Sequence, residues 1–384
     1  MISKFISFKN FHNNKASQKT KVNLKNILGK KSEILKSLSN NYKINGNIKK
    51  IKKKFKNYKN IRLIGMGGSI LGSKAIYSFL KDNIKKNLFF IDNLNSVSSF
   101  DQKKKYLNLI ISKSGNTLET ISNVNVLIKK KDKNIFITED KKSYLLSLAQ
   151  ILKSEVVHHN NYIGGRYSVL SEVGMLPADL MGLDPKKFRQ LNSLIKNRFF
   201  FNALLTNVDS ITKLYNKKKS NSIILNYDPR LENFLEWYKQ LIGESLGKKG
   251  KGIQPIISNM PKDNHSVMQL YLDGLKNNFY SFFFLNEKKS HKLKKNYLSK
   301  NFNFLKEKTL NHIIKSQKLA TEKVFSSKKI PFRSFEILNR DEKTLGELFI
   351  FFILETILLG KALNVNPYRS EERRVGKECR SRWS

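Results

Sequence analysis

Short apolar runs alternate with segments of helical periodicity between residues 60 and 139. The runs cover residues 61–64, 88–91, 106–111 and 135–138. Strands separated in this way by helices are typical of a parallel sheet wrapped by helices. A second alternating block begins at residues 222–227 and contains another candidate strand at 279–285. The pattern predicts an α/β protein with two blocks in tandem, which indicates a duplicated architecture.

Two long helices are predicted in the second block. Residues 231–242 place six apolar side chains on one helix face, and Gly243 is expected to end that helix. Residues 342–363 predict a long, mostly buried helix. The lysine-rich N-terminal segments, typical of solvated helix, predict a helical extension. The expected divisions are a helical extension (1–58), a first α/β domain (59–200), a second domain with the C-terminal helix (201–368) and a tail (369–384).

Length and composition limit the class of protein. A chain of 384 residues with 40% hydrophobic content is long enough for two globular domains. The longest apolar run, 348–354, is well short of the ~20 residues that cross a bilayer, and the apolar patch 5–8 is too short for a signal peptide. We therefore expect a cytoplasmic protein with no membrane partner. The single cysteine, Cys379, excludes an intramolecular disulfide framework and a cysteine zinc site.

The net charge of +43 makes nucleic acid the first partner to consider. The lysines, however, are scattered along the whole chain among Asn, Ile and Phe, as an A/T-rich coding sequence would place them. No stretch matches a helix-turn-helix, a zinc finger or an aromatic RNA-recognition pattern. We therefore expect no specific nucleic-acid partner.

A glycine-rich loop at residues 65–69 follows the first apolar run and opens a helix. Glycines let backbone N–H groups approach an anion, and the positive end of the following helix attracts it. The dinucleotide fingerprint needs a third glycine where Ile70 stands, and the nucleoside-triphosphate loop needs Lys before Ser or Thr, whereas Ser73 precedes Lys74 here. By itself the loop predicts either a phosphate cradle or only a tight strand-to-helix turn.

A second cluster of small polar residues, 112–120, follows the strand candidate 106–111. Asn116 and Glu119 have the spacing of a capping box, so hydroxyl groups and a lysine gather at a helix start. Two neighbouring strand-to-helix turns at the carboxyl edge of one sheet form a crevice in which such folds bind ligands. The alternative for each residue taken singly is that it only caps a helix.

Five segments with distinctive patterns occur in order, at residues 65–72, 112–120, 164–171, 243–248 and 263–266. Together they make the chain similar to the glucose-6-phosphate isomerase family, and the resemblance extends from about residue 60 to 368. The resemblance implies two sugar-isomerase domains, each a mainly parallel sheet flanked by helices. It also implies a homodimer that interconverts glucose 6-phosphate and fructose 6-phosphate, with neither cofactor nor metal.

The resemblance also implies which residues form the site. Arg166 is the expected cation beside the enediolate, Glu244 the base and His265 the residue that opens the sugar ring. One carboxylate can move a proton between C2 and C1, a guanidinium stabilises the developing negative charge, and a histidine suits ring opening. The implied phosphate ligands are Ser69, Ser112, Lys113, Ser114 and Thr117.

Periodicity alone favours other interpretations of these residues. Glu244 lies off the apolar face of the 231–242 helix, which indicates a surface carboxylate, and His265 follows a predicted helix start, which indicates a capping neighbour. His158 and His159 are adjacent in a strand pattern and would face opposite ways, which disfavours a shared metal. The functional alternatives are another phosphosugar isomerase of this fold, or a sugar-phosphate-binding protein without activity.

The chain departs from the family after Tyr368. The family continues with an acidic residue, a glutamine and later a lysine, whereas residues 369–384 hold five of the twelve arginines and the only cysteine. This tail is typical of translated adapter sequence fused to a truncated reading frame, and Lys377 is not assigned as the missing lysine. We therefore hypothesise that this exact chain is impaired as an isomerase.

Overall fold

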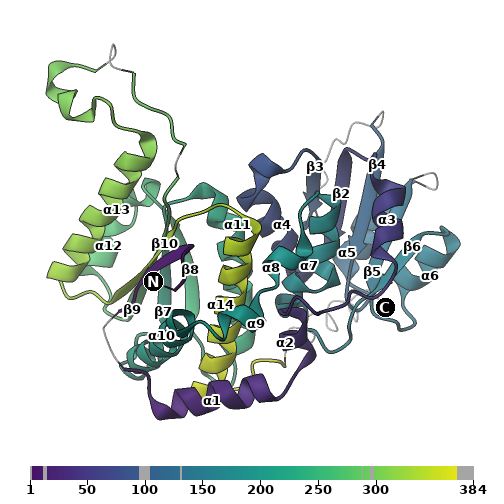
Figure 1. Ribbon diagram of the computed structural model, residues 1–384, viewed down its shortest axis with the longest axis horizontal. Helices are drawn as coiled ribbons and strands as arrows, with labels where there is room; N and C mark the ends of the chain where they lie inside the picture. Colours follow the sequence, from purple (N-terminus) through teal and green to yellow (C-terminus); the bar gives the residue numbers. More distant parts are fainter. Residues whose placement is uncertain are drawn as a thin grey trace.

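A computed structural model describes residues 2–11, 15–94, 104–129, 132–287, 289–294 and 298–369, with two five-stranded sheets side by side (Figure 1). The first sheet has the order β3-β2-β4-β5-β6, and all its strands are parallel. The α/β class and the parallel arrangement are therefore confirmed. The strands are β2 (Asn60–Gly65), β3 (Asn87–Ile91), β4 (Tyr106–Ile111), β5 (Lys133–Thr138) and β6 (Glu155–His158).

Helices cover both faces of the first sheet because alternate strand residues point to opposite sides. Ile64, Ile110 and Phe136 pack against α5 (Leu118–Leu127) and α6 (Tyr144–Ile151). Their strand neighbours join the larger core on the other side. That side is covered by α3 (Ile48–Phe55), α4 (Leu71–Phe79) and α7 (Glu172–Leu180). The lysine-rich α3 buries Ile51 and Phe55 and exposes most of its lysines, as predicted.

The second sheet has the order β1-β10-β9-β7-β8 and is parallel except for β1, which is antiparallel to β10. The prediction that residues 1–58 are helical is therefore wrong for its first part. β1 covers the edge of β10 with its buried Ile6 and with Phe8, whose tilted ring lies 4.8 Å from that of Phe335 between centroids. The strands are β1 (Ile6–Lys9), β7 (Asn221–Asn226), β8 (Gln254–Asn259), β9 (Asn278–Leu285) and β10 (Phe332–Ile337).

The helix α14 (Glu342–Ala362) stands between the two sheets (Figure 1) and matches the predicted buried helix within one residue. It packs against α1 (Gln18–Gly29), α8 (Pro185–Phe188), α10 (Arg198–Asn216) and α11 (Glu232–Leu246). One apolar cluster runs through both sheets and these helices. The short helices α2 (Glu33–Ser37) and α9 (Leu191–Leu194) also contribute buried residues to this cluster.

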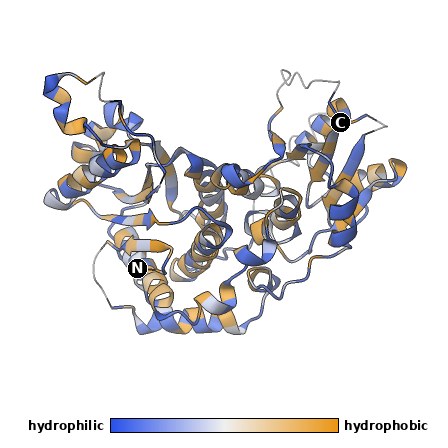
Figure 2. Cartoon of the chain, turned by 45° about the horizontal axis from the view of Figure 1, so that its top comes forward, coloured by the Kyte–Doolittle hydropathy of each residue, from blue (hydrophilic) through white to orange (hydrophobic). Residues whose placement is uncertain are grey.

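Hydrophobic residues lie along the strands and the central helices in Figure 2, as a core of this kind requires. Two further helices, α12 (Met268–Asp273) and α13 (Leu310–Ser327), flank the second sheet. Among the described residues no helix has both the length and the apolarity needed to cross a bilayer.

The prediction that Gly243 ends its helix is wrong, because α11 continues to Leu246. Ser245 and Leu246 are fully buried, and an exposed glycine within a helix costs only about 1 kcal/mol. The last turn closes where the N–H of Gly247 donates to the carbonyl of Gly243. Glu244 therefore belongs to a fixed helical turn and not to a loop.

Candidate active site

The glycine loop between β2 and α4 is built around backbone contacts that exclude side chains. Gly67 has a φ of +51°, a left-handed conformation that favours glycine. A Cβ on Gly68 would lie 2.2 Å from the carbonyl carbon of Gly165, the first residue of the turn η3 (Gly165–Leu170). The loop that holds Ser69 therefore lies directly against the turn that holds Arg166.

The second polar loop, residues 112–117, lies beside the glycine loop because β2 and β4 are neighbouring strands in which Gly65 pairs with Ile111. Ser112 is buried, and its Oγ lies 2.8 Å from Oγ1 of Thr117. The prediction that the two turns meet at the carboxyl edge of one sheet is confirmed. Ser114 is exposed, and its Oγ accepts the N–H of Asn116.

The predicted capping box of α5 is wrong. The N-cap residue is Thr117, and it makes no capping hydrogen bond because its hydroxyl faces Ser112. Asn116 Oδ1 instead accepts the N–H of Tyr144, the first residue of α6, at 2.9 Å. The polar side chains of this loop therefore connect neighbouring elements of the sheet edge.

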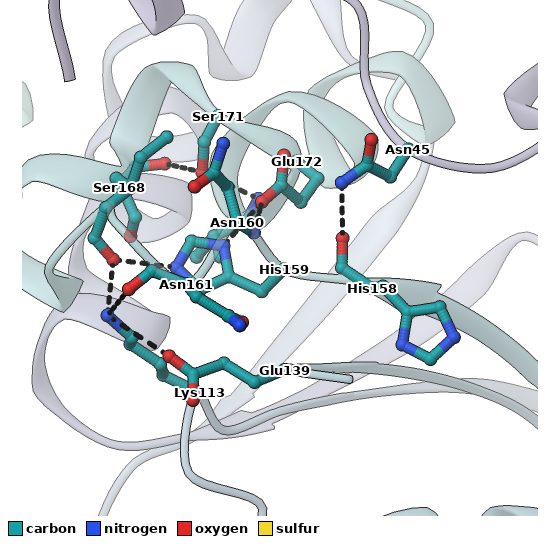
Figure 3. Close-up of polar contacts among 12 residues, drawn as sticks. Asn45, Lys113, Glu139, His158, His159, Asn160, Asn161, Ser168, Ser171 and Glu172 are labelled. Atoms are coloured by element: carbon teal, nitrogen blue, oxygen red, sulfur yellow. Dashed lines mark hydrogen bonds and ion pairs between the residues drawn. The ribbon is translucent and has the colours of Figure 1, made fainter. Parts of the chain in front are cut away.

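Lys113 turns its ammonium group toward the protein chain (Figure 3). Its Nζ donates to the carbonyls of Asn161 and Ile163 at 2.9 and 3.0 Å and lies 3.3 Å from a carboxylate oxygen of Glu139. Lys113 thus connects the polar loop to the segment that precedes η3.

Arg166 and Glu244, which are 78 residues apart in sequence, form an ion pair. Arg166 is 3% exposed, and its Nη1 donates to Oε2 of Glu244 at 2.9 Å. Its Nε donates to Ser245 Oγ at 2.8 Å, and its Nη2 donates to the carbonyls of Pro367 and Arg369 at 2.7 and 3.1 Å. The Glu244 side chain keeps 26% of its surface exposed, so the carboxylate is oriented but accessible. The surface-carboxylate interpretation from periodicity missed this pairing.

Gln240 is a site residue that the sequence did not indicate. Its Nε2 donates to Oε1 of Glu244 at 2.6 Å, one helical turn away, so both oxygens of that carboxylate have donors. A Cβ on Gly67 would lie 2.8 Å from the same Nε2. The buried Oε1 of Gln240 has no hydrogen-bond partner among the described residues. Gln240 thus lies between the glycine loop and Glu244.

Residues 11–379 match the model of the family described as phosphoglucose isomerase. The chain belongs to the phosphoglucose isomerase family. It is 35% identical over 355 residues to the glucose-6-phosphate isomerase of Methanocaldococcus jannaschii, and the match covers 84% of each chain.

Solved structures similar to this member of the phosphoglucose isomerase family share its fold. A hypothetical protein of Thermus thermophilus has a TM-score of 0.84 at 20% identity, covering 95% of this chain and 94% of that chain. A glucose-6-phosphate isomerase from Chlamydia trachomatis has a TM-score of 0.70 at 18% identity, covering 87% and 72%. The expected sugar-isomerase type of fold is therefore confirmed.

His265, the remaining residue of the family motif, lies away from the Arg166–Glu244 pair. It ends the exposed turn η5 (Lys262–His265) after β8, at the carboxyl edge of the second sheet. Asn259, the last residue of β8, donates to Glu232 in the first turn of α11. Glu244 lies twelve residues further along this helix, about 18 Å away. Within one chain, the structure does not bring His265 and Glu244 together.

The adjacent histidines at the end of β6 face opposite sides, as predicted. His159 is 2% exposed and contacts Glu172, whereas the side chain of His158 is 42% exposed and its Nδ1 lies 3.7 Å from Asp140. Across the described part of the chain, no group of three or more His, Cys, Asp or Glu residues is placed to hold a metal ion.

Proposed function

We propose that this protein interconverts glucose 6-phosphate and fructose 6-phosphate through an enediolate. The observation that supports this most strongly is a buried guanidinium, Arg166, 2.9 Å from the carboxylate of Glu244 in a member of the phosphoglucose isomerase family. The pair lies against the glycine loop, so the proton chemistry and the phosphate end of a small sugar fit within one site.

Glu244 is the proposed base that moves the proton between C2 and C1 of the sugar. This step needs an ionised carboxylate in a fixed position, and Gln240 and Arg166 each donate to one of its oxygens. Negative charge then develops on the oxygens of the enediolate. Arg166 stabilises that charge without losing a proton, because guanidinium groups stay protonated in proteins.

The phosphate group is proposed to bind between the two polar loops. The hydroxyls of Ser112 and Thr117 lie 2.8 Å apart after β4, and Ser69 follows the neighbouring strand β2. The N–H groups in the first turns of α4 and α5 have no partner within their own helices and favour an anion. Lys113 adds a positive charge at the edge of this region, although its ammonium group contacts two carbonyls. The proposed ligands are Ser69, Ser112, Lys113, Ser114 and Thr117.

His265 is proposed to open the sugar ring, and its placement supports the expected homodimer. Because it is exposed and lies at the opposite end of α11 from Glu244, a second copy of the chain is the simplest source of this side chain. Exposed apolar side chains between residues 270 and 310 are available for contact with such a partner. They are Leu270, Leu275, Phe302, Phe304 and Leu310.

Mixing two inactive variants tests this arrangement. In a heterodimer of Glu244→Gln and His265→Gln chains, one of the two sites would hold both native residues. Random reassembly after mild dissociation should then recover about a quarter of the wild-type activity. A mixture that stays inactive while capture of one tagged variant recovers the untagged variant would contradict a site shared between copies.

The C-terminal segment contacts the proposed active site directly. Pro367 and Arg369 accept hydrogen bonds from Arg166, while the rest of the tail, 370–384, lies outside the described residues. We retain the hypothesis that this chain is impaired by its tail. Comparing the turnover of this chain with that of a version carrying a family-like C-terminus tests it, and equal turnover would refute the defect.

The activity itself is tested by following glucose 6-phosphate formation from fructose 6-phosphate with a coupled dehydrogenase. A cytoplasmic location is also proposed, and cell fractionation tests it. Activity on another phosphosugar, with none on fructose 6-phosphate, would favour the alternative of a different isomerase of this fold. Sugar-phosphate binding without any turnover, also with a family-like C-terminus, would favour a protein that only binds.

A further inference from the structure

A buried pair of ionisable side chains lies near Lys113 of the polar loop, residues 112–117 (Figure 3). His159 and Glu172 are 2% and 0% exposed, and Nδ1 of the histidine is in hydrogen-bond contact with Oε1 of the glutamate. Neither His159 nor Glu172 is among the site residues that the family resemblance implies. A buried ionic pair of this kind needs a full set of partners to offset its desolvation.

The contacts assign the charge of the pair. Nε2 of His159 faces the carbonyl of Ile163 at 3.0 Å, and a carbonyl only accepts, so this nitrogen has a proton. Oε1 of Glu172 also accepts the N–H of Asn160 at 2.8 Å. Burial would raise the pKa of Glu172, but its hydrogen bond with His159, the charge of His159 and the Asn160 N–H outweigh burial, and the pKa is lowered. Glu172 is then ionised, and both ring nitrogens of His159 donate.

Residues of other segments also contact the His159–Glu172 pair. The hydroxyl of Tyr42 donates to Oε2 of Glu172 at 2.9 Å, and Nη1 of Arg189 donates to the carbonyl of Tyr42 at 3.3 Å. Both oxygens of the glutamate and both nitrogens of the histidine therefore have partners. The pair has one well-defined geometry, in which Nε2 of His159 points toward the polar loop.

That nitrogen meets the polar loop at a shared carbonyl. Ile163 O accepts from Nε2 of His159 and from Nζ of Lys113, both at 3.0 Å. The backbone also joins the two segments, because the N–H of His159 donates to Thr138 O, and the hydroxyl of Thr138 donates to Lys113 O. Three residues beyond Ile163, the same segment reaches Arg166.

We propose that His159 and Glu172 are positioning residues for phosphate binding, because they fix the Ile163 carbonyl that anchors Lys113 and the polar loop. The inference rests on the proposed function, since it concerns the same phosphate site. The pair itself does not contact the substrate. The pair acts through the Ile163 carbonyl, so the donor at the Nε2 position is the group that matters.

Two substitutions at position 159 separate the two ring nitrogens. His159→Asn keeps a donor near the Nδ1 position and loses the one that faces Ile163, whereas His159→Gln keeps a donor near the Nε2 position. His158→Gln is the matched control, because it changes the adjacent, largely exposed histidine. Calorimetry with inorganic phosphate measures binding, and the coupled assay separates KM from kcat for fructose 6-phosphate.

We expect His159→Asn to weaken phosphate binding and raise KM by about tenfold, the range for a lost hydrogen bond to a charged group, with kcat within about threefold of wild type. His159→Gln should stay within about threefold of wild type in all three quantities, and the control should not differ from wild type. Unchanged phosphate affinity in His159→Asn would overturn the proposal. An equal loss in both variants would also overturn it, because the effect would then lie with packing.

If His159→Asn does not fold, nuclear magnetic resonance of the wild-type chain tests the same point. Inorganic phosphate should shift the ring resonances of His159, which are assigned by their absence from the His159→Gln chain, and unshifted resonances at saturation would overturn the proposal. Phosphate binding does not depend on turnover. A chain that binds phosphate but isomerises no sugar, also with a family-like C-terminus, would refute the proposed function and leave the comparison of affinities intact.

Discussion

Replacing Gly68 by alanine should separate the glycine loop from the turn that holds Arg166. The added Cβ would lie 2.2 Å from the carbonyl carbon of Gly165 and 2.4 Å from its oxygen. These are backbone atoms, so no side-chain rotation relieves the contact. Restoring an ordinary separation of about 3.5 Å requires the two loops to move apart by about 1 Å.

A displacement of about 1 Å in a catalytic arrangement costs about 100-fold in rate. We therefore expect Gly68→Ala to lower kcat/KM for fructose 6-phosphate by about 100-fold and to destabilise the fold by about 1–3 kcal/mol. Gly165→Ala is the matched comparison, because its Cβ would lie 3.8 Å from the nearest heavy atom, Cα of Gly68. The coupled assay and thermal unfolding measure both variants. Equal kcat/KM in the two would refute the argument from close backbone contact.

Three further predictions concern side chains that the structure buries or orients. Burial raises the pKa of Glu347 from 4.5 to about 7, so the folded chain binds more protons than the unfolded chain between these values, and stability falls as pH rises through them. The free energy of unfolding of Glu347→Gln, measured with urea relative to wild type, should therefore be about 2–3 kcal/mol higher at about pH 8 than at about pH 4. A difference between variant and wild type that does not change with pH would contradict this. Arg333→Met leaves Glu355 buried without its cation and should lower the free energy of unfolding by about 3–5 kcal/mol. The double variant, Arg333→Met with Glu355→Met, should recover part of this loss. Gln240→Leu removes one donor to the base and should lower kcat by about tenfold in the coupled assay, with little change in thermal stability.

The strands in the middle of each sheet could be predicted because they are continuous apolar runs. β4 is buried along its whole length, and β9 likewise, so periodicity and burial agree. β8 and β10 gave weaker signals, since β8 includes Pro255 and is largely half-buried, and β10 has the charged Arg333 as its second residue. β1 pairs with a strand more than 300 residues away, and no local pattern indicates such a partner.

The glycine loop and the polar loop could be predicted from the sequence, whereas the geometry around Glu244 could not. Glycines and hydroxyl residues after two neighbouring strands are local signals. The contact between Gln240 and Glu244 needs the helix to continue through Gly243, which the local sequence argues against. The role of Glu244 came from a family motif, and its pairing with Arg166 depends on how two distant segments pack.

Turnover and binding measured together in Glu244→Gln test the central proposal most directly. Gln has the same shape as Glu and keeps an oxygen for the donors at Arg166 or Gln240, but it cannot accept the C2 proton. We expect isomerisation of fructose 6-phosphate to fall below detection in the coupled assay, while calorimetry gives a phosphosugar affinity within about threefold of wild type. Turnover close to that of the wild-type chain would contradict the assignment of Glu244 as the base.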